Sequence, residues 1–181
     1  MKFTFSWLKD HLNTSANVNE IVDCLNKIGL EVSNLKTYKT DVKNLKIAKI
    51  IDVKKHPNAD KLNVCIIQFD EEQTQVVCGA PNVKLNKKYV FAPSGTYIGG
   101  IDLTLKKSVI RDVESNGMLC SEKELEISDD HNGIIELPDS INLNDNISNY
   151  LGIDDPIIEI EITPNRGDCL SLIHISEPTR R

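Results

Sequence analysis

The sequence predicts a mainly β fold with some helix, built around a small closed antiparallel barrel. From residue 45 onward, apolar residues recur with the two-residue period of strands. The connections between these runs are rich in Gly, Pro, Asn and Asp, which favours hairpins over helical crossovers. About 110 residues of such short strands suit one small barrel.

Two short helices are predicted before the barrel, within residues 6–29. Ser6 is expected to cap the first helix. Asn17 followed by Glu20 resembles a capping box for the second, and Gly29 is expected to end it. These helices form a hairpin with a small apolar core.

The barrel strands follow in a nearly continuous series. A separate run alternates apolar and polar residues from Ile158 to Thr163 and ends at Pro164, which cannot continue a ladder. The strands predicted for the barrel are 45–53, 62–69, 75–78, 88–92, 96–98, 101–105, 108–110 and 134–137.

Composition limits the class of protein. The 181 residues contain no apolar stretch near the roughly 20 residues of a membrane span, and the charged start lacks a secretion signal. We therefore expect a cytoplasmic chain with no membrane partner. The five cysteines form no CxxC pair, which disfavours a zinc site or a disulfide framework. Cys65 and Cys78 lie on apolar strands and are interpreted as core residues.

The charge is unevenly distributed, although the net value is −6. Residues 43–61 carry six lysines against two aspartates, whereas residues 112–161 carry fourteen carboxylates and one lysine. A solvated surface would explain this pattern. A groove on the barrel lined by cations would instead bind nucleic acid.

The candidate nucleic-acid contacts are the cations around the first barrel turn. Arg111 is the best candidate for a bidentate phosphate contact. For His56 a structural role, closing the turn before Pro57 with its ring resting on the barrel, is favoured over an RNA contact. Few aromatic rings are available to stack bases, so sequence-specific reading is not expected. The predicted contacts are Lys49, Lys54, Lys55, His56, Lys61 and Arg111, and the candidate rings are Phe69, Tyr89, Phe91 and Tyr97.

Four motifs in the middle of the chain, taken together, resemble the tRNA-binding OB domain that is appended to several aminoacyl-tRNA synthetases. They are HPNADKL (56–62), VVCGAPN (76–82), VFAPSGTYIGG (90–100) and SNGMLCSEKELEI (115–127). The flanking stretches FSWLKDHL, GLEVSNL and EIEITPNRGDCLS are similar to the amino-terminal region of the bacterial phenylalanyl-tRNA synthetase β subunit. This resemblance implies an OB barrel, residues 40–151, inserted into a small split α+β domain made of residues 1–39 and 152–169.

The resemblance also implies a function. In that family an α2β2 heterotetramer joins phenylalanine to its tRNA with ATP and magnesium, and the synthetic active site belongs to the α subunit. We therefore expect tRNA and the α subunit as partners, no DNA partner, and no catalytic residue, metal site or cofactor within this chain. Two alternatives stay open: a stand-alone tRNA-binding OB protein without enzyme activity, and a barrel that serves chiefly to dock protein.

The last twelve residues, LSLIHISEPTRR, depart from the resemblance. Back-translated, they resemble a transposase-type sequencing adapter, and two of the chain's four arginines lie there. We therefore predict that residues 170–181 are a non-native tail.

Overall fold

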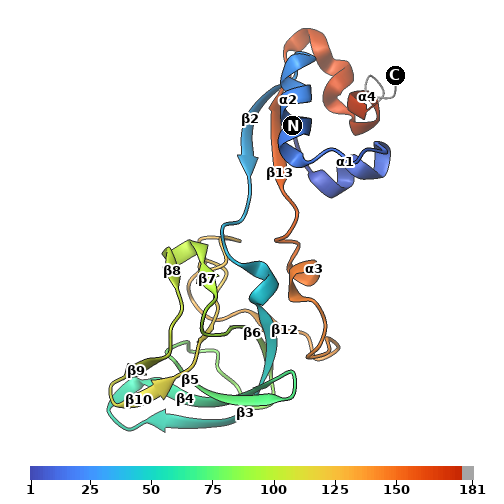
Figure 1. Ribbon diagram of the computed structural model, residues 1–181. Coiled ribbons are helices and arrows are strands. Elements are labelled where there is room, and N and C mark those ends of the chain that lie inside the picture. Colours follow the sequence, from blue (N-terminus) through green and yellow to red (C-terminus); the bar gives the residue numbers. More distant parts are fainter. Residues whose placement is uncertain (177–181) are drawn as a thin grey trace. The chain divides into compact units, whose positions relative to one another are not determined.

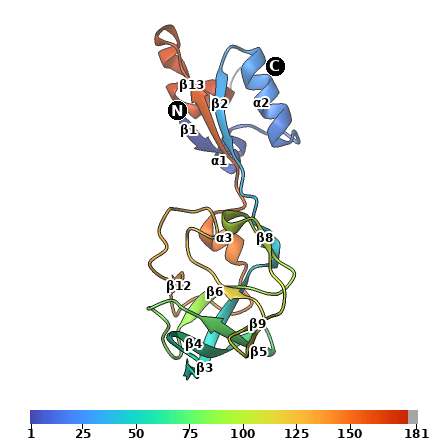
Figure 2. The ribbon, with the colours of Figure 1, turned by 90° about the vertical axis from the view of Figure 1, so that its left-hand side faces the viewer.

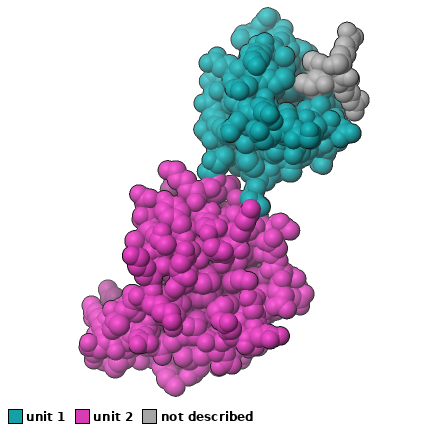
Figure 3. Space-filling model, viewed as in Figure 1, with its two compact units in different colours: residues 1–37, 154–181 teal, residues 38–153 magenta. Residues whose placement is uncertain are grey.

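The computed structural model describes residues 1–176, which fold into two compact units (Figure 3). Unit 1 combines residues 1–37 with the residues from 154 onward, and unit 2 is the continuous segment 38–153 between them. All paired strands are antiparallel, so the predicted fold class, mainly β with helices, is confirmed. None of the helices within residues 1–176 is long and apolar enough to cross a membrane.

Unit 1 is a three-stranded sheet with helices packed against it (Figures 1 and 2). The strand order is β1-β13-β2, so the late strand β13 lies between two early strands. Phe3, Leu25 and Ile158 meet in its buried core. The elements are β1 (Lys2–Thr4), α1 (Phe5–His11), α2 (Val18–Lys27), β2 (Glu31–Lys36), β13 (Ile157–Glu161), η3 (Pro164–Leu170) and α4 (Leu172–Ser176).

The helix caps in unit 1 follow local sequence, with one correction. The predicted capping box of Asn17 and Glu20 is confirmed at the start of α2. The cap of α1 is Thr4 rather than Ser6, because the helix begins directly where β1 ends: Thr4 Oγ1 accepts from the Trp7 N–H at 3.2 Å. Ser6 instead donates its N–H to Asp155 Oδ1 at 2.9 Å.

The late part of unit 1 includes some of the residues predicted to be a non-native tail. Leu172 and Ile175 on α4 are buried in the unit 1 core. Residues 177–181 lie outside the described residues. The origin of the tail stays a prediction.

Unit 2 is built on a six-stranded sheet in the order β11-β6-β3-β4-β5, with β12 added to β6. Ser115 Oγ accepts from the Val77 N–H at 3.1 Å, and the Asn116 N–H donates to the Gln75 carbonyl at 2.9 Å. Residues just before β11 thus bond to β5, which joins the two edges and closes the barrel. Its strands are β3 (Lys46–His56), β4 (Ala59–Phe69), β5 (Glu72–Cys78), β6 (Lys88–Ala92), β11 (Met118–Leu119) and β12 (Glu136–Leu137).

Smaller elements decorate the barrel, and some differ from the sequence expectation. The predicted strand 101–105 is reduced to two residues because a turn of 3-10 helix occupies its start, and the helix α3, capped by Asn146, was not predicted. These elements are η1 (Val42–Asn44), β7 (Tyr97–Ile98), η2 (Gly99–Ile101), β8 (Leu103–Thr104), β9 (Ser108–Ile110), β10 (Val113–Ser115) and α3 (Ile147–Leu151).

The barrel interior contains the predicted core cysteines. Cys65 and Cys78 pack with Ile50, Ile67 and Phe91 in one buried cluster, which confirms their interpretation as core residues. Burial raises the pKa of the Cys65 thiol to about 12, so the thiol is neutral at physiological pH.

Candidate nucleic-acid interface

The turn between β3 and β4 is held by His56. This ring is only 4% exposed, and its Nδ1 accepts from the Asn58 N–H at 3.0 Å. Its Nε2 lies 3.0 Å from the Ile110 carbonyl, which can only accept, so Nε2 carries the proton. Both ring nitrogens are therefore used inside the protein. His56 closes the turn, and we remove it from the proposed tRNA contacts.

A second turn, at the tip of the β9–β10 hairpin, is fastened to the first. Arg111 and Asp112 have φ values of 47° and 72°, the left-handed pair of a tight two-residue hairpin turn. Arg111 Nη1 donates to the Asn58 carbonyl at 3.0 Å, and Asn58 Nδ2 donates to Asp112 Oδ2 at 3.1 Å. We call these two joined turns, residues 56–59 and 110–113, the two-turn tip. Arg111 is exposed, so its remaining N–H groups are available at the surface of the two-turn tip.

The strand ladder places the candidate lysines on two opposite faces of the β3–β4 hairpin. Side chains alternate along a strand, and directly paired residues share a face. Lys55 pairs with Asn63, and Lys61 lies two residues before Asn63, so we assign both to one face. Lys49 and Lys54 pair with Gln68 and Val64 and occupy the other face. The sequence predicted one group of lysines, and the structure separates it into two pairs.

The two pairs also differ in charge. Lys54 Nζ lies 2.9 Å from Asp52 Oδ2, and this hydrogen bond lowers the pKa of the Asp52 carboxyl. Among residues 1–176 neither Lys55 nor Lys61 forms an ion pair, and both are exposed. The face with Lys55 and Lys61 therefore presents more net positive charge to a phosphate backbone.

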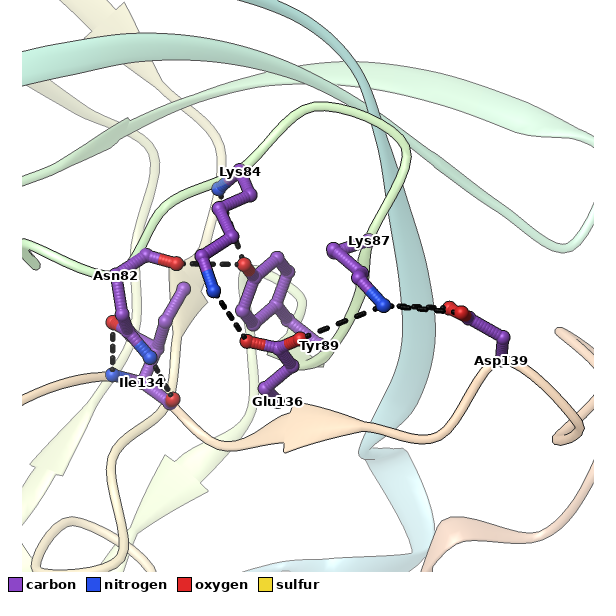
Figure 4. A network of polar contacts seen from close by, with 7 residues as sticks. All are labelled: Asn82, Lys84, Lys87, Tyr89, Ile134, Glu136 and Asp139. Atoms are coloured by element: carbon purple, nitrogen blue, oxygen red, sulfur yellow. Dashed lines mark hydrogen bonds and ion pairs between the residues drawn. The ribbon is translucent and has the colours of Figure 1, made fainter.

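Three further lysines, Lys84, Lys87 and Lys88, contact the carboxylate-rich segment 112–161, and Figure 4 shows the contacts of Lys84 and Lys87. Lys87 Nζ lies 3.0 Å from Asp139 Oδ2, and this contact raises the pKa of Lys87. Lys84 Nζ lies 3.6 Å from Glu136 Oε2, and Lys88 Nζ donates to the Asp139 carbonyl at 2.9 Å. These lysines link the loop before β6 to the region around β12, so we leave them out of the nucleic-acid surface.

The four candidate stacking rings have structural contacts. Tyr89 and Phe91 are buried at 0% and 1% exposure. Phe69 packs on Phe91 with ring centroids 4.9 Å apart, and Tyr97 bonds through its hydroxyl to Asp102. An interface at the two-turn tip would therefore contact phosphates rather than stack bases.

Comparison with known proteins identifies the barrel. Residues 45–146, more than half of the chain, match the family described as "Putative tRNA binding domain". The chain belongs to this tRNA-binding family. The matched segment lies wholly within unit 2 and includes the β3–β4 and β9–β10 hairpins of the two-turn tip.

Curated relatives extend the similarity to both units. The chain is 49% identical over 178 residues to the phenylalanine-tRNA ligase beta subunit of Mesorhizobium japonicum, an alignment that covers 97% of this chain and 22% of that protein. The corresponding subunit of Bartonella quintana is 48% identical over 170 residues, covering 93% and 21%. The resemblance predicted from the sequence motifs is confirmed. The chain spans about a fifth of the length of these relatives.

Among solved structures, a MetRS related protein from Pyrococcus horikoshii aligns with a TM-score of 0.40 at 21% identity, covering 55% of this chain and 84% of that one.

Proposed function

We propose that this chain is the amino-terminal, tRNA-binding and structural part of a phenylalanine-tRNA ligase beta subunit. In the full α2β2 enzyme it would serve the ATP-dependent attachment of phenylalanine to its tRNA in the cytoplasm, with the α subunit as partner. The observation that supports this most strongly is the extent of the similarity. An alignment covering 97% of the chain includes unit 1 as well as the tRNA-binding barrel. A stand-alone tRNA-binding barrel would not require unit 1.

We further propose that the chemistry of ligation takes place outside this chain. Within residues 1–176 no three His, Cys, Asp or Glu side chains are grouped to hold a metal ion. In this proposal ATP and magnesium bind to the rest of the enzyme, as the family resemblance implies.

We propose that the tRNA contact is the two-turn tip with the adjoining face of the β3–β4 hairpin. Lys55, Lys61 and Arg111 would meet the phosphate backbone, and Lys49 and Lys54 on the opposite face would contribute less. Lysine binds phosphate as a point charge, so the part of the affinity that comes from these cations should be indifferent to sequence and sensitive to salt. This charge distribution supports the proposal because the three further lysines contact the carboxylate-rich segment instead.

A salt titration of tRNA binding by fluorescence anisotropy tests the assignment. Each lost phosphate contact should reduce the slope of log affinity against log salt by roughly 0.7 to 0.9. We expect Lys55→Ala with Lys61→Ala to lower the slope by roughly 1.4 to 1.8. The matched control, Lys49→Ala with Lys54→Ala, removes the same formal charge from the opposite face. Equal losses in both double variants would refute the face assignment and leave only diffuse charge.

A second experiment tests the role in the ligase. The complete beta subunit that contains this chain is co-expressed with its α subunit, with and without Lys55→Ala and Lys61→Ala. We expect a raised KM for tRNA in aminoacylation and unchanged phenylalanine-dependent ATP-pyrophosphate exchange, which needs no tRNA. Failure of the wild-type complex to charge tRNA with phenylalanine would refute the proposed function.

A further inference from the structure

A cavity of about 340 Å³ lies in unit 2. Its volume is at the lower end of the range for small-ligand sites. Chain segments 77–81, 118–124 and 131–134 contribute its walls. Gly79 borders it on the side of β4, where a Cβ added to this glycine would lie 3.1 Å from Leu62 Cδ2 and 3.9 Å from the Lys61 carbonyl. The cavity therefore adjoins the strand that carries Lys61.

Part of the cavity wall is apolar. Val77, Leu119 and Ile134 are buried side chains that line it, with Met118 beside them. A flat heteroaromatic ring suits such walls, and the polarizable thioether of methionine makes favourable contacts with ring systems. Gly79 and the small Ala80 also line the cavity.

The polar side chains that line the cavity include one carboxylate, Glu124, with Ser121 and His131 beside it. The Glu124 side chain is 12% exposed, and its Oε2 accepts from the Ser121 N–H. Its Oε1 lies 4.0 Å from His131 Nδ1, which is 3.2 Å from Ser121 Oγ. A carboxylate accepts at about four lone-pair positions, so a fixed Glu124 retains capacity for donors of a ligand.

The same groups are poorly arranged for catalysis. Ser121 Oγ and Glu124 Oε1 both approach the same nitrogen of His131, whereas a relay needs them on opposite nitrogens. Burial raises the pKa of the Cys78 thiol, and the nearby Glu124 charge adds to this rise, so the thiol stays neutral. The geometry suits binding rather than covalent chemistry.

We propose that this cavity binds an unpaired guanine base of the RNA held at the two-turn tip. The Watson–Crick edge of guanine carries two adjacent donors, N1–H and N2–H, which match the two oxygens of one carboxylate. Adenine and cytosine offer one amino group each beside an acceptor, and uracil flanks its single N–H with carbonyl oxygens that a carboxylate repels. Unpaired bases are the usual targets of RNA reading, because their edges are accessible once they leave the stack.

This inference rests on the proposed tRNA binding, and single-stranded RNA hexamers test the two separately. Labelled hexamers of five uridines and one guanosine are compared with hexauridine by fluorescence anisotropy, using the full chain at one salt concentration. We expect the guanosine hexamer to bind about tenfold more tightly, as for one bidentate base contact. Glu124→Gln keeps the volume and replaces one acceptor by a donor, so it should abolish the preference. Glu122→Gln is the control, since it makes the same charge change two residues away, outside this cavity.

The outcomes separate the two proposals. Loss of preference in Glu124→Gln alone, with an unchanged thermal midpoint, supports the cavity. Tight but equal binding of both hexamers by the wild type, or a preference that survives Glu124→Gln, overturns the cavity and leaves tRNA binding standing. Salt-sensitive binding should fall equally for both hexamers in Lys55→Ala with Lys61→Ala. Absence of any RNA binding overturns both proposals.

Discussion

Replacing Asn82 by Ala should destabilise unit 2 by about 2 to 3 kcal/mol. Asn82 Oδ1 accepts from the Ile134 N–H at 3.0 Å, and Asn82 Nδ2 donates to the Ile134 carbonyl at 2.7 Å (Figure 4). Ile134 is 6% exposed, so its backbone N–H and carbonyl would lose their partners where little water can replace them. A typical hydrogen bond contributes about 1 kcal/mol net, and an orphaned buried group costs about 1 to 3 kcal/mol.

Urea unfolding followed by two probes measures this loss. The chain has one tryptophan, Trp7, on α1 in unit 1, so its fluorescence reports on that unit, whereas circular dichroism reports on both. With an m-value of about 2 kcal/mol/M, Asn82→Ala should lower the midpoint of the unit 2 transition by about 1 M urea. The Trp7 transition should stay in place. The control Asn132→Ala alters an exposed side chain in the same region and should shift neither transition noticeably.

Two results would refute this reasoning. Equal shifts in Asn82→Ala and Asn132→Ala would mean that the paired bonds to Ile134 contribute nothing specific. A Trp7 transition that moves together with the circular dichroism signal would mean that the two units unfold as one, so that the loss cannot be assigned to unit 2.

Three further predictions concern the chain as a whole. Residues 40–151 should fold alone with cooperative unfolding, because the barrel closes its own sheet edges and encloses its own core; a broad, non-cooperative melt would contradict this. If other parts of the enzyme bind ATP and activate phenylalanine, as proposed above, the purified chain should show no phenylalanine-dependent ATP-pyrophosphate exchange, and measurable exchange would oppose the assignment. Stability should fall as pH rises above the ordinary thiol value of 9.0 toward about 12, because folded Cys65 keeps its proton while the unfolded thiol ionises; Cys65→Ala should flatten this alkaline decline in a pH series of urea midpoints.

Local signals made much of the fold predictable from sequence. The capping box of α2 involves residues three apart, and it appears where the sequence places it. The strands β3 to β6 were likewise predictable, because apolar residues recur within each of them in a pattern typical of strands. By contrast, β1 has three residues, too few for a period to show, and it forms only because β13 arrives from more than 150 residues away to pair with it.

The candidate site was less predictable, for two different reasons. That Lys54 and Lys55 face opposite ways follows from strand alternation alone, so this signal was present in the sequence. The bonding of Arg111 to Asn58 joins turns 53 residues apart and depends on how the barrel closes. The cavity at Glu124 has the same origin, since it combines three segments that meet only in the folded barrel.

The tip should bind RNA weakly by itself, and this follows from how the charge is arranged. Lys55, Lys61 and Arg111 supply three cations on a chain of net charge −6, and the four candidate rings are engaged in structural contacts instead. A few phosphate contacts give low affinity at physiological salt, because the binding constant falls steeply as the salt concentration rises. If the chain is part of a ligase that already holds its tRNA elsewhere, the second contact becomes intramolecular and needs no high affinity. Replacing Lys55, Lys61 and Arg111 should then weaken tRNA binding by the complete enzyme. The fold-change should equal the one that the isolated chain shows, because the substitutions leave the effective concentration of the tethered tRNA unchanged.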